Sequence, residues 1–167
     1  MRIPPGAPMK KLLLTLDLVP SSCWYNNVRA LLTQTQWNKI KSQVSDKAHN
    51  VCEICGGIGS KHPVECHEVW EYNEKTLIQK LVKLIALCPD CHSVKHFGLA
   101  QIQNKGRKAL KHLMKINKIT KKAAEKYIAD SFMEWAERSG KNWKLDISYL
   151  EIYGIDTKKI KYEKEKV

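Results

Sequence analysis

Two C-x-x-C motifs, Cys52-x-x-Cys55 and Cys88-x-x-Cys91, constrain the fold of this chain more than any other feature. Paired motifs of this kind on tight turns present four thiolates at the corners of a tetrahedron, the closed geometry of structural zinc. Two glycines follow the first pair and suit such a turn. Zinc binds sites of this type with about 10–16 kcal/mol. We therefore predict a Zn²⁺ ion that holds the centre of the chain together.

The segment Cys88–His92 also has the C-x-x-C-H spacing of c-type haem attachment. Haem attachment needs export and leaves the first cysteine pair without a role. The longest apolar run, residues 12–19, is too short to span a membrane and contains an acid. Prolines precede this run and no small-residue cleavage site follows it, unlike in a signal peptide. We expect no membrane segment and a cytoplasmic, reducing location, where cysteines bind metal instead of forming disulfides.

The spacing of apolar residues predicts an α+β chain. Alternating leucines predict a strand over residues 12–19, and helical spacing predicts an amphipathic supporting helix over 34–48. A strand is expected over 64–72, and the apolar stretch 77–87 is compatible with either a strand or a short helix. A helix is expected from Asp90 to Phe97, with Gly98 ending it.

Beyond Gly98 the chain returns to a helical pattern. One helix is predicted over residues 99–116 and a second from Thr120 to Gly140, with Ala124, Ile128, Phe132 and Trp135 as its buried stripe. Alternation over residues 143–149 predicts a closing strand, and a charged tail follows from residue 158. These features divide the chain into an N-terminal support (1–48), a cysteine-rich centre (49–98) and a basic helical extension (99–167).

The positive charge of the chain is concentrated after its centre. The net charge is +12, and residues 95–126 contain ten lysines or arginines and one acid, Glu125. A basic face of this kind attracts phosphates and releases counterions from nucleic acid, although a solvated helix face has the same composition. The predicted phosphate contacts are Lys95, Arg107, Lys108, Lys111 and Lys115.

Three histidines lie in and around the cysteine pairs. His92 and His96 are four residues apart on the expected helix, so they project from one face and form half of a metal site. The alternative is that His92 packs beside the zinc and His96 caps the helix. His67 lies on the expected strand between the cysteine pairs, among acids and a thiol.

The order C-x-x-C, strand histidine, then C-x-x-C-H-x-x-x-H resembles the HNH nucleases, the ββα-metal or His-Me finger superfamily, in their zinc-stapled form. The resemblance covers about residues 49–98. It implies a central ββα-metal finger stapled by a zinc ion on four cysteines and flanked by the N-terminal strand and helix and by the C-terminal helices with their closing strand. It also implies hydrolysis of phosphodiester bonds in double-stranded DNA with one divalent cation and one histidine general base.

Matched to the motif, His67 takes the position of the general base. His92 and His96 take the positions that hold the catalytic cation, which is Mg²⁺, Mn²⁺ or another divalent ion. The four cysteines of the paired motifs match the structural zinc ligands.

Two positions depart from the family pattern. Cys66 stands where the family has a histidine or aspartate ligand for the catalytic cation, and a thiolate there favours a softer metal than magnesium. Either Glu65 or Glu68 is available as a replacement oxygen ligand. Lys83 stands where the family has its middle asparagine, and Asn73 is the nearest asparagine upstream.

The resemblance leaves room for two other functions. Cys66 and Lys83 are also what we would expect in a zinc-knuckle protein that binds nucleic acid but has lost catalysis. A regulatory zinc-finger scaffold would lack affinity for nucleic acid. If the chain cuts both strands of a duplex, two active sites are needed, and a homodimer is then the expected assembly.

Overall fold

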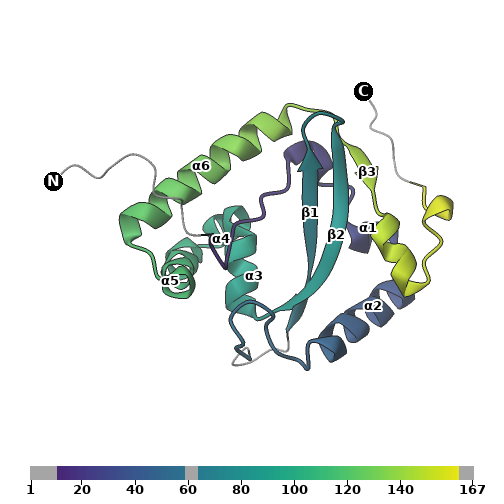
Figure 1. Cartoon of the computed structure of the whole chain (residues 1–167), viewed down its shortest axis with the longest axis horizontal. Helices are drawn as coiled ribbons and strands as arrows, with labels where there is room; N and C mark the ends of the chain where they lie inside the picture. The colour runs from purple at the N-terminus through teal and green to yellow at the C-terminus, as the bar shows by residue number, and fades with distance from the viewer. Residues whose placement is uncertain (1–10, 59–63, 162–167) are drawn as a thin grey trace.

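The computed structural model describes residues 11–58 and 64–161 and has the mixed α+β class that the sequence predicts. Its centre is a three-stranded sheet in the order β1-β2-β3 (Figure 1). Strands β1 (Glu65–Asn73) and β2 (Ile78–Leu87) form an antiparallel hairpin. The short β3 (Lys144–Asp146) pairs in parallel with the start of β2.

Helices cover both faces of the sheet (Figure 1). One face packs against α1 (Val28–Leu31), α2 (Gln34–Lys47) and the 3₁₀ helices η2 (Ser148–Tyr153) and η3 (Thr157–Lys159). The other face packs against α3 (Pro89–Lys95), α4 (Phe97–Ile102), α5 (Gly106–Asn117) and α6 (Lys121–Ser139), and a further 3₁₀ helix, η1 (Ser21–Cys23), contacts α6. Within the described ranges no helix is long and apolar enough to cross a bilayer.

Strand β2 separates two hydrophobic cores. Ile85 and Leu87 belong to the core beneath α3, α4 and α5, and Leu84 and Ala86 belong to the core beneath α1 and α2. A strand buried on both faces has a continuous apolar run instead of an alternating one. This explains why the apolar pattern of residues 77–87 is compatible with either a strand or a short helix.

Two predicted helices are confirmed with their end signals. Helix α2 begins at a capping box formed by Thr33 and Gln36 and buries Trp37, Ile40 and Val44. Helix α6 lies between its N-cap, Thr120, and its C-cap, Gly140. Of the predicted stripe on α6, Ala124 is fully buried, and Ile128, Phe132 and Trp135 are half-buried.

The prediction of a strand over residues 12–19 is wrong. The segment alternates as expected, with Leu14 and Leu16 buried and Leu13 exposed, but it pairs with no strand of the sheet. Its backbone is satisfied by side chains: Asn117 accepts from two of its amides, and the Tyr127 hydroxyl accepts from the Leu16 N–H at 3.0 Å. The alternating burial therefore comes from an extended segment that packs on helices. Side chains of those helices supply the hydrogen bonds that a neighbouring strand would otherwise provide.

Three predicted boundaries are also wrong. Gly98 lies inside α4 instead of ending a helix, since the break falls at His96, between α3 and α4. The helix predicted over 99–116 is two helices, because residues 103–105 interrupt it. The closing strand ends at Asp146, and residues 148–153 form a 3₁₀ helix.

Replacing Asn117 with alanine is expected to lower the free energy of unfolding by about 2–5 kcal/mol. The Asn117 side chain accepts from the N–H groups of Leu13 and Leu14 and donates to the carbonyls of Leu14 and Leu113. Each buried polar group left unpaired costs about 1–3 kcal/mol. Urea unfolding measures the change. The exposed Asn38→Ala on α2 is the control, with a change within about 0.5 kcal/mol; equal shifts would contradict the prediction.

Candidate functional site

The four cysteines of the paired motifs come together. Their sulfur atoms all lie within 4.8 Å of one another, and the Sγ atoms of Cys55 and Cys88 are 3.6 Å apart. The first pair lies on a turn before β1, where Gly56 has a φ of +72° that favours glycine. In the second pair Cys88 is the N-cap of α3 and Cys91 lies in its first turn. All six cysteines of the chain are in the described residues, and none forms a disulfide.

Hydrogen-bond donors surround this cysteine cluster. The N–H of Gly57 donates to Cys55 Sγ at 3.4 Å, and Nε2 of His112 on α5 lies 3.2 Å from Cys91 Sγ. The hydrogen bond between Cys52 and Cys91 lowers the pKa of the Cys52 thiol to about 4 and raises the pKa of the Cys91 thiol, so without a metal the pair favours a single thiolate. A closed set of four sulfurs fits a structural zinc ion, which these cysteines could hold.

A second cluster consists of the three histidines. His67 on β1, His92 on α3 and His96 at the end of α3 each offer a nitrogen, and these atoms lie within 4.8 Å of one another. The ring centroid of His67 lies 5.4 Å from that of His92 and 5.0 Å from that of His96. The strand and the helix therefore bring together the imidazoles that the sequence singled out.

Carboxylates hold two of these rings from outside. Oδ2 of Asp17 lies 2.8 Å from Nε2 of His67, and Oε2 of Glu65 contacts Nδ1 of His92. The rings of His67 and His92 are thus each held at one nitrogen, and the second nitrogen of each ring takes no part in that contact. Nδ1 of His67 is buried and has no hydrogen-bond partner among the described residues.

Burial favours the neutral form of His92 and His96. It lowers the pKa of His92, and it lowers the pKa of His96 to about 4, with a further contribution from the positive charge that the neighbouring rings would carry. Neutral imidazoles offer lone pairs, and a carboxylate on the far nitrogen is the usual support of a metal-binding histidine. The donor set therefore fits a divalent cation.

The structure does not bring Cys66 or Glu68 to the histidine cluster, so their prediction as ligands of the catalytic cation is wrong. Side chains alternate along β1, and both residues lie on the face opposite His67. The Glu68 carboxylate accepts from the Val28 N–H at 2.9 Å and from Trp70 Nε1 at 3.1 Å. Burial raises the pKa of Glu68 to about 7, and burial with the Glu68 charge raises the pKa of Cys66 to about 12.

The prediction that Lys95 contacts phosphates is also wrong. It is 6% exposed, and its ammonium pairs with Asp17 and donates to Thr15 Oγ1 at 2.9 Å. A side chain buried in this way does not reach a phosphate backbone. The lysine at 95 therefore belongs to the support of His67 and not to a nucleic-acid surface.

Neither alternative to the family's asparagine contacts His67. Lys83 is exposed and forms an ion pair with Glu53 at 3.5 Å. Asn73 closes the hairpin turn, where its side chain accepts from the N–H groups of Lys75 and Thr76. The group that holds His67 is Asp17, which the sequence analysis missed.

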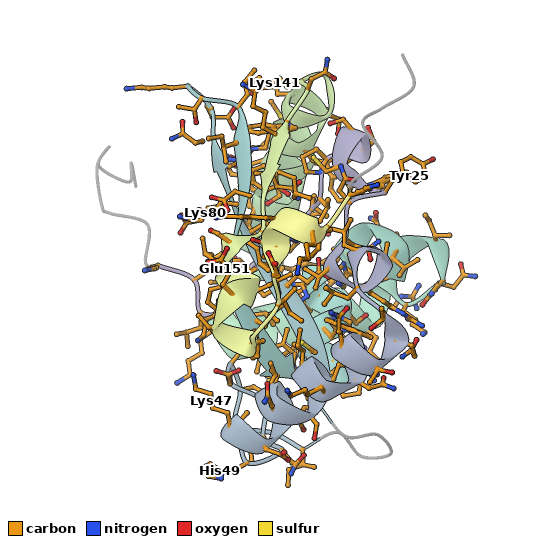
Figure 2. All side chains as sticks on the ribbon, turned by 90° about the vertical axis from the view of Figure 1, so that its right-hand side faces the viewer. Tyr25, Lys47, His49, Lys80, Lys141 and Glu151 are labelled. Atoms are coloured by element: carbon orange, nitrogen blue, oxygen red, sulfur yellow. The ribbon has the colours of Figure 1, made fainter. Side chains whose placement is uncertain are left out.

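The other predicted phosphate contacts are exposed on α5: Arg107, Lys108, Lys111 and Lys115. Helix α5 packs against α3, the helix that carries His92. Lys108 also forms an ion pair with Asp90 in the first turn of α3. Exposed lysines occur elsewhere too, and Figure 2 shows Lys47 and Lys80 on the side of α2 and β3. Basic charge is therefore dense on α5 but not confined to it.

Comparisons of the chain with protein-family models, with curated proteins and with solved structures find no match. The two side-chain clusters and the order of the motifs are the features that indicate its function.

Proposed function

We propose that the protein is a metal-dependent endonuclease of the HNH type that hydrolyses phosphodiester bonds in DNA. The observation that carries this proposal is the convergence of His67, His92 and His96 beside a separate cluster of four cysteines. The histidines come from a β-hairpin and from the helix that follows it, in the order that the HNH motif requires. A scaffold protein needs the cysteines but has no use for a second cluster of three imidazoles.

The side chains of this site divide the work of hydrolysis. His67 accepts a proton from the attacking water at Nδ1, the ring nitrogen that carries no other hydrogen bond among the described residues. Histidine is the side chain that most often performs this proton transfer in enzymes. His92 and His96 would hold the divalent cation, and Glu65 orients His92 through its Nδ1. When bound, such a cation supplies a Lewis acid for the scissile phosphate.

The cysteine cluster supports this site without taking part in its chemistry. Cys91 and His92 are adjacent, and Cys88 caps the helix that carries His92. A zinc ion on the cysteines would tie the start of α3 to the turn that carries Cys52 and Cys55, which is bonded to β2 through the Glu53 N–H and the Ala86 carbonyl. It would thereby help to hold His92 and His96 at their separation from His67 on the strand β1, which pairs with β2.

The basic helix α5 supports DNA as the substrate. Its four exposed cations recur at helical spacing, and the helix lies against α3. Cations at this spacing contact successive phosphates of one strand and position the duplex without reading its sequence. We assign this role to Arg107, Lys108, Lys111 and Lys115.

Cleavage of supercoiled plasmid in the presence of Mg²⁺ or Mn²⁺ tests the proposal. We expect cutting that a chelator stops and that His92→Ala and His96→Ala each reduce by on the order of 10²-fold or more, because the cation loses a ligand. The control is His49→Asn, since His49 is exposed, lies outside both clusters and has a positive φ that asparagine tolerates. Salt-dependent DNA binding without cutting by any divalent metal would support a non-catalytic binding protein instead.

A further inference from the structure

We infer that Asp17, held in place by Lys95, is a positioning residue that fixes the proton of His67 on Nε2 and leaves a free lone pair on Nδ1. The catalytic consequence of this arrangement rests on the proposed function. The arrangement of the proton does not, and it is measured separately below.

Asp17 reaches His67 from a segment far away in the sequence. Its Oδ2 lies 2.8 Å from His67 Nε2, and the contact is enclosed, because His67 is 2% exposed. The Asp17 backbone N–H donates to the Lys95 carbonyl at 2.9 Å. The Lys95 ammonium lies 3.2 Å from Oδ1 and 3.1 Å from Oδ2 of the same carboxylate. Main chain and side chain of Lys95 therefore hold Asp17 at two points.

The chemistry of these groups determines the tautomer. A carboxylate can only accept a hydrogen bond, so the nitrogen that faces Asp17 has to carry the proton. A neutral imidazole has a single N–H, and the other nitrogen is then an acceptor. Among the described residues nothing donates to Nδ1 of His67 or accepts from it. Asp17 thus supplies what a general base needs, a lone pair at a defined position.

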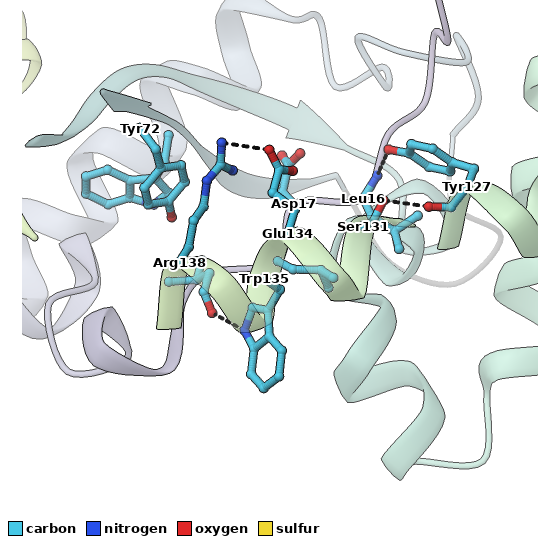
Figure 3. A pocket seen from close by; sticks show the side chains of 11 residues that line it. Leu16, Asp17, Tyr72, Tyr127, Ser131, Glu134, Trp135 and Arg138 are labelled. Atoms are coloured by element: carbon cyan, nitrogen blue, oxygen red, sulfur yellow. Dashed lines mark hydrogen bonds and ion pairs between the residues drawn. The ribbon is translucent and has the colours of Figure 1, made fainter. Parts of the chain in front are cut away.

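A cavity beside Asp17 makes the carboxylate accessible from outside the histidine cluster. It has a volume of about 160 Å³, and Asp17 lies on its wall whereas His67 does not. Figure 3 shows Asp17 there between α6 residues Tyr127, Glu134 and Arg138. Since one water takes up about 30 Å³ in the liquid, this space admits a small carboxylate such as formate.

The variant Asp17→Asn tests the inference. Lys95 can only donate, so it keeps the carboxamide oxygen and turns the amide NH₂ towards His67. Nε2 must then accept, and the proton moves to Nδ1. In ¹⁵N NMR of the histidine rings, without added divalent cation, we expect Nε2–H in the wild type and Nδ1–H in Asp17→Asn. Cleavage by Asp17→Asn should fall by on the order of 10³–10⁴-fold in kcat with little change in KM.

Matched variants separate this effect from a loss of structure. Asp130→Asn removes an exposed carboxylate of α6 that pairs only with Lys126 in the described interactions, and it should leave the His67 signals unchanged. Asp17→Ala with added formate should regain about 10–100-fold of the lost rate, because formate enters the cavity and accepts from Nε2. His67→Ala should gain nothing from formate.

The outcomes are distinguishable from a failure of the proposed function. If the wild type does not cut DNA but shows Nε2–H, the inference about Asp17 stands and the nuclease proposal falls. A wild-type spectrum with Nδ1–H overturns the inference, and this measurement suffices if Asp17→Asn does not fold. An unchanged tautomer in folded Asp17→Asn also overturns it, and so does, where the wild type cuts DNA, a folded Asp17→Ala that formate does not rescue.

Discussion

Replacing Cys91 with serine is expected to abolish zinc binding and unfold the part of the molecule built around α3. Cys91 is fully buried in the core shared by β2, α3 and α5, and its sulfur is one of the four that lie within 4.8 Å of one another. Zinc binding contributes about 10–16 kcal/mol in small modules, whereas the net stability of a domain is about 5–15 kcal/mol. Loss of the ion is therefore comparable with the whole stability.

Thermal unfolding by circular dichroism and zinc content by mass spectrometry measure this effect. A strong chelator should reproduce the result of Cys91→Ser in the wild type. The control is Cys66→Ala, because Cys66 is half-buried on the opposite face of the sheet and outside the cluster. We expect it to retain one zinc per chain and to lose about 1 kcal/mol. A Cys91→Ser protein that keeps its zinc and its melting temperature would refute the assignment.

The second large effect is expected for His67→Ala, whose cleavage rate should fall by on the order of 10²–10⁴-fold. The imidazole is buried at 2% exposure, so it does not contribute to the DNA-binding surface, and affinity for DNA should be retained. Plasmid nicking rates and binding measured over a range of salt concentrations separate the two quantities.

Two controls accompany this variant. Circular dichroism has to show that His67→Ala remains folded, since it removes a buried ring. His49→Asn changes an exposed histidine and should cut at the wild-type rate. Cutting at an unchanged rate by folded His67→Ala would show that another group is the base.

Local patterns predicted those elements that depend on nearby residues. Helix α2 and helix α6 have strong end signals and helical spacing, and β1 has strand periodicity, so each was found within a few residues. Both side-chain clusters were also anticipated, because motif spacing on a hairpin and a helix fixes which residues share a face. What the sequence did not reveal is how segment 11–20 lies, since its hydrogen bonds go to Asn117 and Tyr127, about a hundred residues away.

The errors at the site have the same physical origin. Residues adjacent to His67 on a strand necessarily face away from it, so Cys66 and Glu68 could have been excluded by alternation alone. One sequence feature distinguishes Asp17, which is the single acid in an apolar run. No feature distinguishes Lys95 from the basic residues that follow it. Asp17 contacts His67 and Lys95 only through the tertiary fold, so no spacing of residues along the sequence predicts these contacts.

The extended segment before α1 has a consequence for modular reuse of this fold. Residues 49–98 would carry both sets of potential ligands if they were transplanted into another protein, yet the acid that touches His67 would stay behind in the donor. Moving that stretch into another protein would therefore transfer the potential metal ligands without the group that holds His67. A protein that acquires residues 49–98 needs a partner for His67 Nε2, which either accompanies the segment or comes from the recipient protein.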